Sequence, residues 1–131
     1  MQLLLPLHGL LMLTGLILLI TAVFIAHKKK GTWFINHKKF GVSGFIAMLL
    51  AFFAIFVLKT IHHYPHIHSD HAKFGLIALF SLLIIMLIGL LVTKGLTGLK
   101  KIHRALAWLI TLGMIGVAGV GVVSFLKILQ H

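Results

Sequence analysis

The sequence contains no cysteine, and its only acidic residue is Asp70, against twelve lysines and arginines. Without cysteine the chain can form no disulfide, no iron–sulfur cluster, no thiolate metal site and no covalent c-type haem attachment. Any haem must therefore be bound noncovalently. The excess of basic residues could indicate a nucleic-acid-binding surface or could reflect membrane topology. The positions of these residues along the chain decide between the two interpretations.

Charge is also absent from four long stretches, which together make up most of the chain. Residues 1–26, 40–58, 74–93 and 105–126 contain no Lys, Arg, Asp or Glu. About 20 apolar helical residues cross a hydrocarbon core about 30 Å thick. The runs do not alternate apolar and polar residues as the strands of a membrane barrel do. The pattern predicts an all-α membrane protein with four transmembrane helices in one domain, residues 1–131.

The charges and helix breakers between these stretches give approximate helix boundaries. The helices are expected at about 3–26, 36–60, 70–93 and 101–129. Asn36 is the expected N-cap of the second helix, and Ser69 or Asp70 is the expected cap of the third. The run from His62 to His68 contains Pro65 and ends the second helix.

The basic residues are distributed unevenly among the loops. Nine of them flank the first and third loops and three lie on the other side. The positive-inside rule then places those two loops in the cytoplasm and both termini outside. We predict an up-down-up-down bundle, N-out and C-out, in a bacterial inner membrane, with no nucleic-acid partner. The first apolar run has no basic segment before it, which favours a membrane helix over a cleaved signal peptide.

Four histidines lie near the starts of the four helices. They are His8, His37, His71 and His103, at spacings of 29, 34 and 32 residues. The alternating topology places His8 and His71 near the outer face and the other two near the inner face. Facing imidazoles in a bundle core are typical of bis-histidine haem ligation. We predict two noncovalent b haems, although a histidine at a helix end could also be a simple interfacial residue.

Small residues recur at fixed distances after these histidines. They are Gly75 and Gly89 after His71, Ala107 and Gly121 after His103, Gly41 and Gly44 after His37, and Gly15 after His8. The first two pairs are at plus four and plus eighteen, and eighteen residues make five helical turns. The small residues therefore share the histidine's face and could leave room for a flat cofactor. Close helix packing is the alternative interpretation.

A second group of histidines lies in the outer loop. It consists of His62, His63, His66 and His68. Clustered imidazoles can bind divalent metals, so the loop is a candidate metal or acceptor site. The alternatives are a solvated loop or hydrogen bonds to haem propionates. His68 also competes with His71 as outer ligand, but Gly75 favours His71. Lys73 and Arg104, beside the ligands, are candidates to bind propionates.

Short motifs around the four histidines resemble the haem helices of the cytochrome b561 family. The motifs are His8 to Met12, His37 to Gly41, His71 to Gly75 with Gly89, and His103 to Trp108. The chain has four helices where eukaryotic members have six. Ile85 and Ala107 stand where the family often has glutamine and glycine.

The resemblance implies a di-haem b-type cytochrome that transfers electrons across a membrane. Its donor would be a quinol or an ascorbate-like molecule, and its acceptor an outer redox protein or metal ion. As an enzyme it would be an oxidoreductase-type electron carrier. Two alternatives stay open: a cofactor-bearing anchor subunit of a larger respiratory or reductase complex, and a non-haem metal-binding membrane protein. The exposed bundle faces lead us to expect an oligomer or such a complex.

Overall fold

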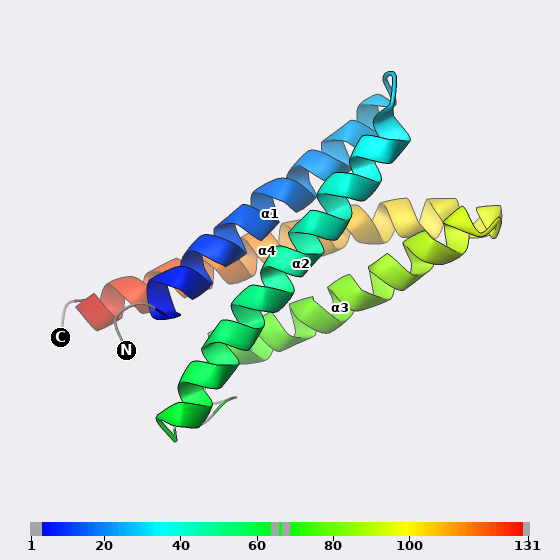
Figure 1. The fold of residues 1–131 in the computed structure, drawn as a ribbon. Coiled ribbons are helices and arrows are strands. Elements are labelled where there is room, and N and C mark those ends of the chain that lie inside the picture. The colour runs from blue at the N-terminus through cyan, green and yellow to red at the C-terminus, as the bar shows by residue number, and fades with distance from the viewer. Residues whose placement is uncertain (1–3, 64–65, 67–68, 130–131) are drawn as a thin grey trace. The chain divides into compact units, whose positions relative to one another are not determined.

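A computed structural model of the chain describes residues 4–63, 66 and 69–129, and 91% of the described residues are helical. The helices are α1 (Leu4–Lys28), α2 (Trp33–Ile61), α3 (Asp70–Thr93) and α4 (Lys100–Leu129), with a short 3-10 turn, η1 (Thr97–Leu99), before α4 (Figure 1). No strand occurs in this described part. The predicted all-α class and the four long helices are confirmed.

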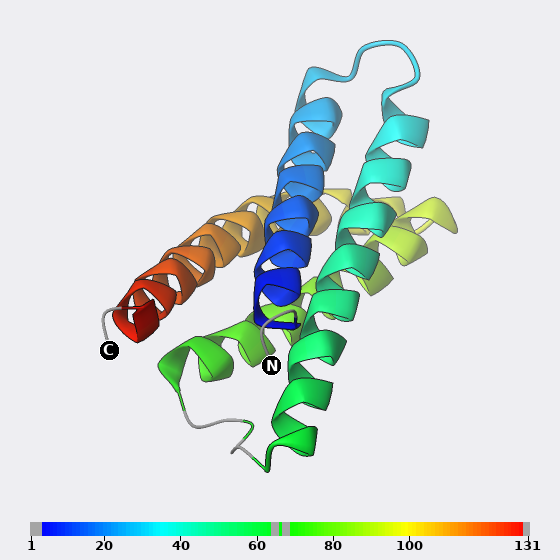
Figure 2. The ribbon, with the colours of Figure 1, turned by 60° about the vertical axis from the view of Figure 1, so that its left-hand side comes forward.

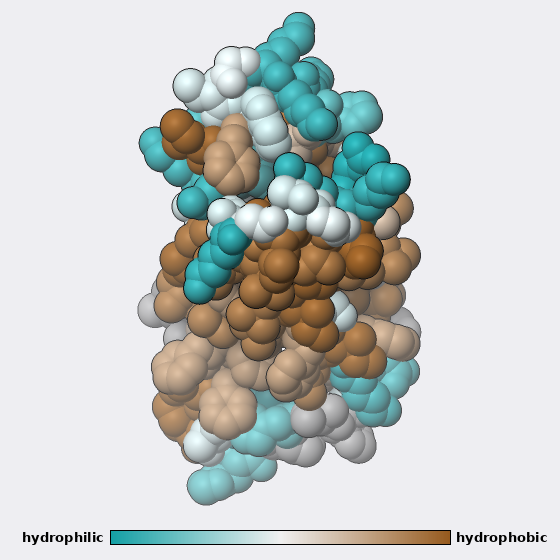
Figure 3. Space-filling model, turned by 90° about the vertical axis from the view of Figure 1, so that its right-hand side faces the viewer, coloured by the Kyte–Doolittle hydropathy of each residue, from teal (hydrophilic) through white to brown (hydrophobic). Residues whose placement is uncertain are grey.

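All four helices are long and apolar enough to cross a membrane. Each also carries large apolar side chains that stay exposed, such as Leu10 (64% exposed), Phe53 (63%), Phe80 (59%) and Leu109 (67%). Apolar side chains dominate the face drawn in Figure 3, and hydrophilic ones gather towards its ends. A soluble protein rarely exposes apolar patches of this extent. The chain is therefore a helical integral membrane protein.

The chain divides into two compact units, Met1–Lys73 and Phe74–His131. In the first unit α1 and α2 are antiparallel and lie side by side (Figures 1 and 2). Their backbones come close at Gly15 and Gly44. A Cβ atom added to Gly44 would lie 2.9 Å from the Gly15 carbonyl oxygen, and one on Gly15 would lie 3.0 Å from the Gly44 oxygen. Both glycines therefore serve close helix packing, the alternative interpretation of the sequence pattern.

The turn between α1 and α2 is tight, with Lys29 and Gly31 in the left-handed region at φ 45° and 55°. α2 begins at Trp33, three residues before the predicted start. Asn36 lies inside the first turn, where its Nδ2 donates to the Thr32 Oγ1 at 3.2 Å. The predicted N-cap at Asn36 was wrong. The Asn36 side-chain amide donates to Thr32, one turn earlier, and Asn36 lies inside the helix rather than at its cap.

The start of α3 agrees with its predicted cap. The helix begins at Asp70, and the Ser69 Oγ accepts a hydrogen bond from the Ala72 backbone N–H at 3.2 Å. A serine oxygen at this position satisfies one of the free N–H groups of the first turn. The cap fixes where α3 starts and therefore places His71 in its first turn.

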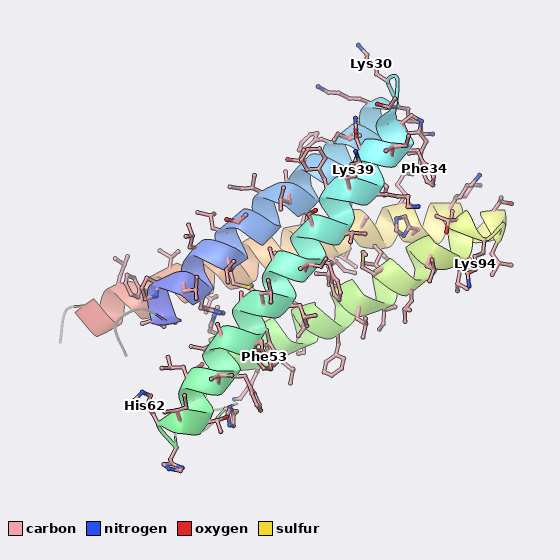
Figure 4. The ribbon with its side chains drawn as sticks, viewed as in Figure 1. Lys30, Phe34, Lys39, Phe53, His62 and Lys94 are labelled. Atoms are coloured by element: carbon pink, nitrogen blue, oxygen red, sulfur yellow. The ribbon has the colours of Figure 1, made fainter. Side chains whose placement is uncertain are left out.

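The second unit contains the rest of α3 and α4. Gly95, at φ 104°, follows the end of α3, and η1 leads into α4. The buried side chains are Leu82 and Ile85 of α3 and Thr111 and Met114 of α4. Lys94 lies at this connection (Figure 4). Lys30 and Lys39 lie near the α1–α2 turn, and His62 is at the opposite end of α2. Each hairpin turn is therefore basic.

Candidate functional site

His8 lies one turn into α1 and is half-buried. Its Nδ1 atom is 2.9 Å from the carbonyl oxygen of Ala51 in α2. A carbonyl oxygen can only accept, so Nδ1 carries the proton and the lone pair of the neutral ring is on Nε2. Histidines that bind a metal through one nitrogen usually donate the other N–H to a carbonyl or carboxylate. His8 thus has the tautomer of a ligand that binds through Nε2.

His71, in the first turn of α3, lies opposite His8 within the first unit. The two ring centroids are 6.3 Å apart and the ring planes are nearly perpendicular, at 86°. A metal–imidazole bond is about 2.0 Å long, so two imidazoles on opposite sides of one metal ion have centroids roughly 6.4 Å apart. The centroid distance of this pair is therefore compatible with two imidazoles that would hold one metal ion between them.

His37 repeats the arrangement of His8 at the other end of the same hairpin. It is the fifth residue of α2, as His8 is of α1. Its Nδ1 donates to the carbonyl oxygen of Ala22 in α1 at 2.9 Å. The ring of Trp33 lies one turn earlier, with the centroids 6.5 Å apart. The lone pair of His37 is therefore also on Nε2.

His103 lies in the first turn of α4, in the second unit, and its Nδ1 is a buried atom. The imidazole packs against Gly89 of α3. A Cβ atom added to Gly89 would be 2.9 Å from the His103 Cε1 and 3.4 Å from its Nδ1. Any side chain at position 89 would force this ring to move. Gly89 therefore makes room for the predicted ligand itself.

The other predicted glycines differ in their surroundings. A Cβ atom added to Gly75, one turn after His71, meets no atom of the described residues within 4 Å. Gly41 faces α1, with the Ala22 Cβ at 4.0 Å. Gly121 is half-buried in α4. Gly75 thus has no described neighbour within 4 Å, as is also true of Gly9 and Gly113, whereas Gly41 is part of the α1–α2 contact.

The two basic residues predicted to bind propionates flank histidines at the helix starts. Lys73 forms an exposed ion pair with Asp70, with Nζ and Oδ1 3.3 Å apart. Exposed pairs of this kind stabilise a fold by only about 1 kcal/mol or less, so Lys73 can exchange its partner easily. Arg104 is exposed beside His103.

The loop after α2 contains the histidines His62, His63 and His66. The His66 ring stacks on Phe56, with centroids 4.5 Å apart, and its carbonyl oxygen accepts from the Lys59 Nζ at 3.0 Å. Among the residues described, no three His or Asp side chains form a group that could hold a metal. His68 lies outside the described residues. The loop site stays a prediction, as does the choice between His68 and His71.

Sequence reasoning missed Ala22 and Ala51, whose carbonyl groups hold His37 and His8. These alanines are 2% and 0% exposed. Their signal is a spacing of seven residues: His8, Gly15 and Ala22 in α1, and His37, Gly44 and Ala51 in α2. A search for shared spacings of seven would have found them, whereas the spacings of four and eighteen did not.

These features define a helical membrane protein with three imidazoles in defined surroundings. Two of them donate to a neighbouring helix, and one packs on a glycine. No family model matches the chain. Comparison with curated proteins and with solved structures also finds no match.

Proposed function

We propose that this protein is a di-haem b-type cytochrome that transfers electrons across a membrane. The outer haem would be bound by His8 and His71, and the inner one by His37 and His103. The observation that carries the proposal is the His8–His71 pair, with ring centroids 6.3 Å apart and His8 held by the Ala51 carbonyl. The motif resemblance to the cytochrome b561 family supports the same assignment.

When bound, haem iron supplies reversible one-electron chemistry. The chain's own residues would hold and surround the macrocycles. His8 and His37 present Nε2 lone pairs and keep their ring orientation through the backbone bonds. Gly75 leaves open space one turn from His71. Lys73 and Arg104 offer positive charge for propionates at the helix starts. The apolar helices exclude water, which favours electron transfer over side reactions.

The membrane orientation is part of the proposal. With the two basic hairpin turns in the cytoplasm, both termini lie outside, and one haem is near each face. A cytoplasmic or quinol donor would reduce one haem, and an acceptor on the outer side would oxidise the other. A bacterial inner membrane provides this setting, and the exposed helix faces offer surface to a partner subunit.

Haem content tests the proposal directly. Purified protein is expected to contain two haems per chain by the pyridine haemochrome assay, with a b-type reduced-minus-oxidised spectrum. The control is the same preparation of a variant with both His8→Ala and His37→Ala, which should contain none. Absence of haem from the unaltered protein, both as purified from haem-replete cells and after reconstitution with haemin, would refute the proposal.

Gly75→Leu tests whether the open space beside His71 accommodates a macrocycle. No described atom approaches a Cβ atom at this position, and leucine favours a helix over glycine by about 1 kcal/mol. We therefore expect unchanged helix content but only one haem per chain. Gly113→Leu is the matched control, because position 113 is also free of described neighbours within 4 Å. Two haems in Gly75→Leu would show that the space has another use.

A further inference from the structure

The α1–α2 hairpin contains an approximate two-fold repeat. The corresponding residues are His8, Gly15 and Ala22 in α1 and His37, Gly44 and Ala51 in α2, with an offset of 29. The contacts repeat with the sequence. Each histidine donates to the alanine carbonyl of the other helix at 2.9 Å. A Cβ atom added to Gly44 would lie 2.9 Å from the Gly15 carbonyl oxygen, and one added to Gly15 would lie 3.0 Å from the Gly44 oxygen.

The spacing of seven explains why these residues act together. Seven residues are about two helical turns, so histidine, glycine and alanine form one stripe along each helix. Two such stripes pack antiparallel, with the glycines at the middle and a histidine opposite an alanine at each end. The alanine methyl groups are buried, at 2% and 0% exposure. A larger side chain there has to push the opposite helix away.

The alanine carbonyl can accept the imidazole without breaking its own helix. A carbonyl oxygen has two lone pairs. The N–H four residues later in the helix uses one of them, and the imidazole uses the other. The bond therefore depends on the distance between the two helices and not on any loss of helical structure.

We infer that Ala51 positions His8 and Ala22 positions His37, each across the helix interface, and that the Gly15–Gly44 crossing sets both positions at once. The inference rests on the proposed function only in taking the two histidines as haem ligands. Its consequence is a crossed dependence. A change at Ala22, in the same helix as His8, acts on His37, and a change at either glycine acts on both histidines.

The test begins with protein free of haem, using ¹⁵N-histidine NMR in detergent micelles. His8→Gln and His37→Gln assign the two signals, which should show the Nδ1–H tautomer. Ala51→Val is expected to convert only His8 to a tautomer mixture, and Ala22→Val only His37. Gly15→Val should convert both. Thr14→Val and Ser43→Val place the same side chain at exposed neighbouring positions, and neither should change either signal.

Haem binding supplies the second readout. Loss of a hydrogen bond to a metal-bound histidine typically weakens binding about 10- to 100-fold. We expect Ala51→Val to weaken one haem by about 10-fold and Ala22→Val to weaken the other. Ala51→Ser, which adds a single oxygen, should change the same signals in the same direction but less, and it serves if the valine variant does not fold.

The two hypotheses fail in different ways. If the tautomers change in the crossed pattern but no variant or parent binds haem, the proposed function is wrong and the positioning stands. If haem binds but Ala51→Val leaves His8 unchanged, or both alanine variants alter the same histidine, the positioning inference is overturned.

Discussion

Alanine in place of His8 is expected to halve the haem content, from two per chain to one, and to leave the midpoint potential of the remaining haem unchanged. A six-coordinate b haem that loses one of its two axial imidazoles is held by a single bond and by apolar contact. The described structure places the His71 ring opposite His8, with the ring centroids 6.3 Å apart, so the lost bond is the one that His8 would make. Haem quantification and a redox titration measure the result.

The other three histidines extend this test to the pairing. His71→Ala should remove the same haem as His8→Ala, and the double variant should lose no more than either single one. His37→Ala and His103→Ala should each remove the second haem. His27→Ala, near the other end of α1, is the control and should keep both haems. Loss of one and the same haem from His8→Ala and His37→Ala would refute the pairing. His68→Ala should also keep both if His71 is the outer ligand.

Electron transfer across a vesicle membrane should depend on all four ligands. If both haems are bound as proposed, the helix lengths would place the two irons on the order of 20 Å apart along the membrane normal. An electron then needs both haems to cross. In proteoliposomes with a trapped reductant and an external acceptor, each single alanine variant is expected to fall to the rate of empty liposomes. Transfer at the unaltered rate with one haem would mean that the other haem is not on the route.

The four helices could be predicted because the charge-free runs are long and their boundaries are polar. The cap at Ser69 was also predictable, since its side chain has one local role. The start of α2 was not. Asn36 can cap a helix or donate to Thr32 from inside the first turn, and the apolar residues 33–35 fit a helix equally well. Local sequence does not choose between these arrangements, because their hydrogen bonds are equivalent.

The candidate histidines could be chosen from the sequence, but their backbone partners could not. The positions of His8 and His37 follow from spacing, whereas their acceptors are backbone carbonyls, which every residue has. Which carbonyl lies within reach depends on how α1 crosses α2. Gly15 and Gly44 set this crossing, although the sequence pattern indicated haem clearance for them. A spacing rule identifies the face of a helix, and tertiary packing decides what lies against that face.

Gly89→Val is expected to remove the haem bound by His103 while keeping the one bound by His71. Even a single Cβ atom at position 89 would lie 2.9 Å from the His103 Cε1, closer than carbon atoms pack. Valine adds two further methyl groups on its Cβ atom, and no χ1 rotamer points both of them away from the His103 ring. The imidazole must therefore leave its position. Such overpacking also costs about 1–3 kcal/mol of folding stability, so the melting temperature should fall as well.

A series at the same position separates the loss of ligation from loss of stability. Gly89→Ala should lower the affinity for this haem less than Gly89→Val does, because the ring has to move by a smaller amount. Gly113→Val, at a position without described neighbours within 4 Å, should keep both haems. Two haems with unchanged potentials in Gly89→Val would contradict the assignment of His103. Gly75→Leu is expected to remove the other haem in the same assay. Two glycines of one helix would then control different cofactors, as expected if α3 ligates one haem and borders the other.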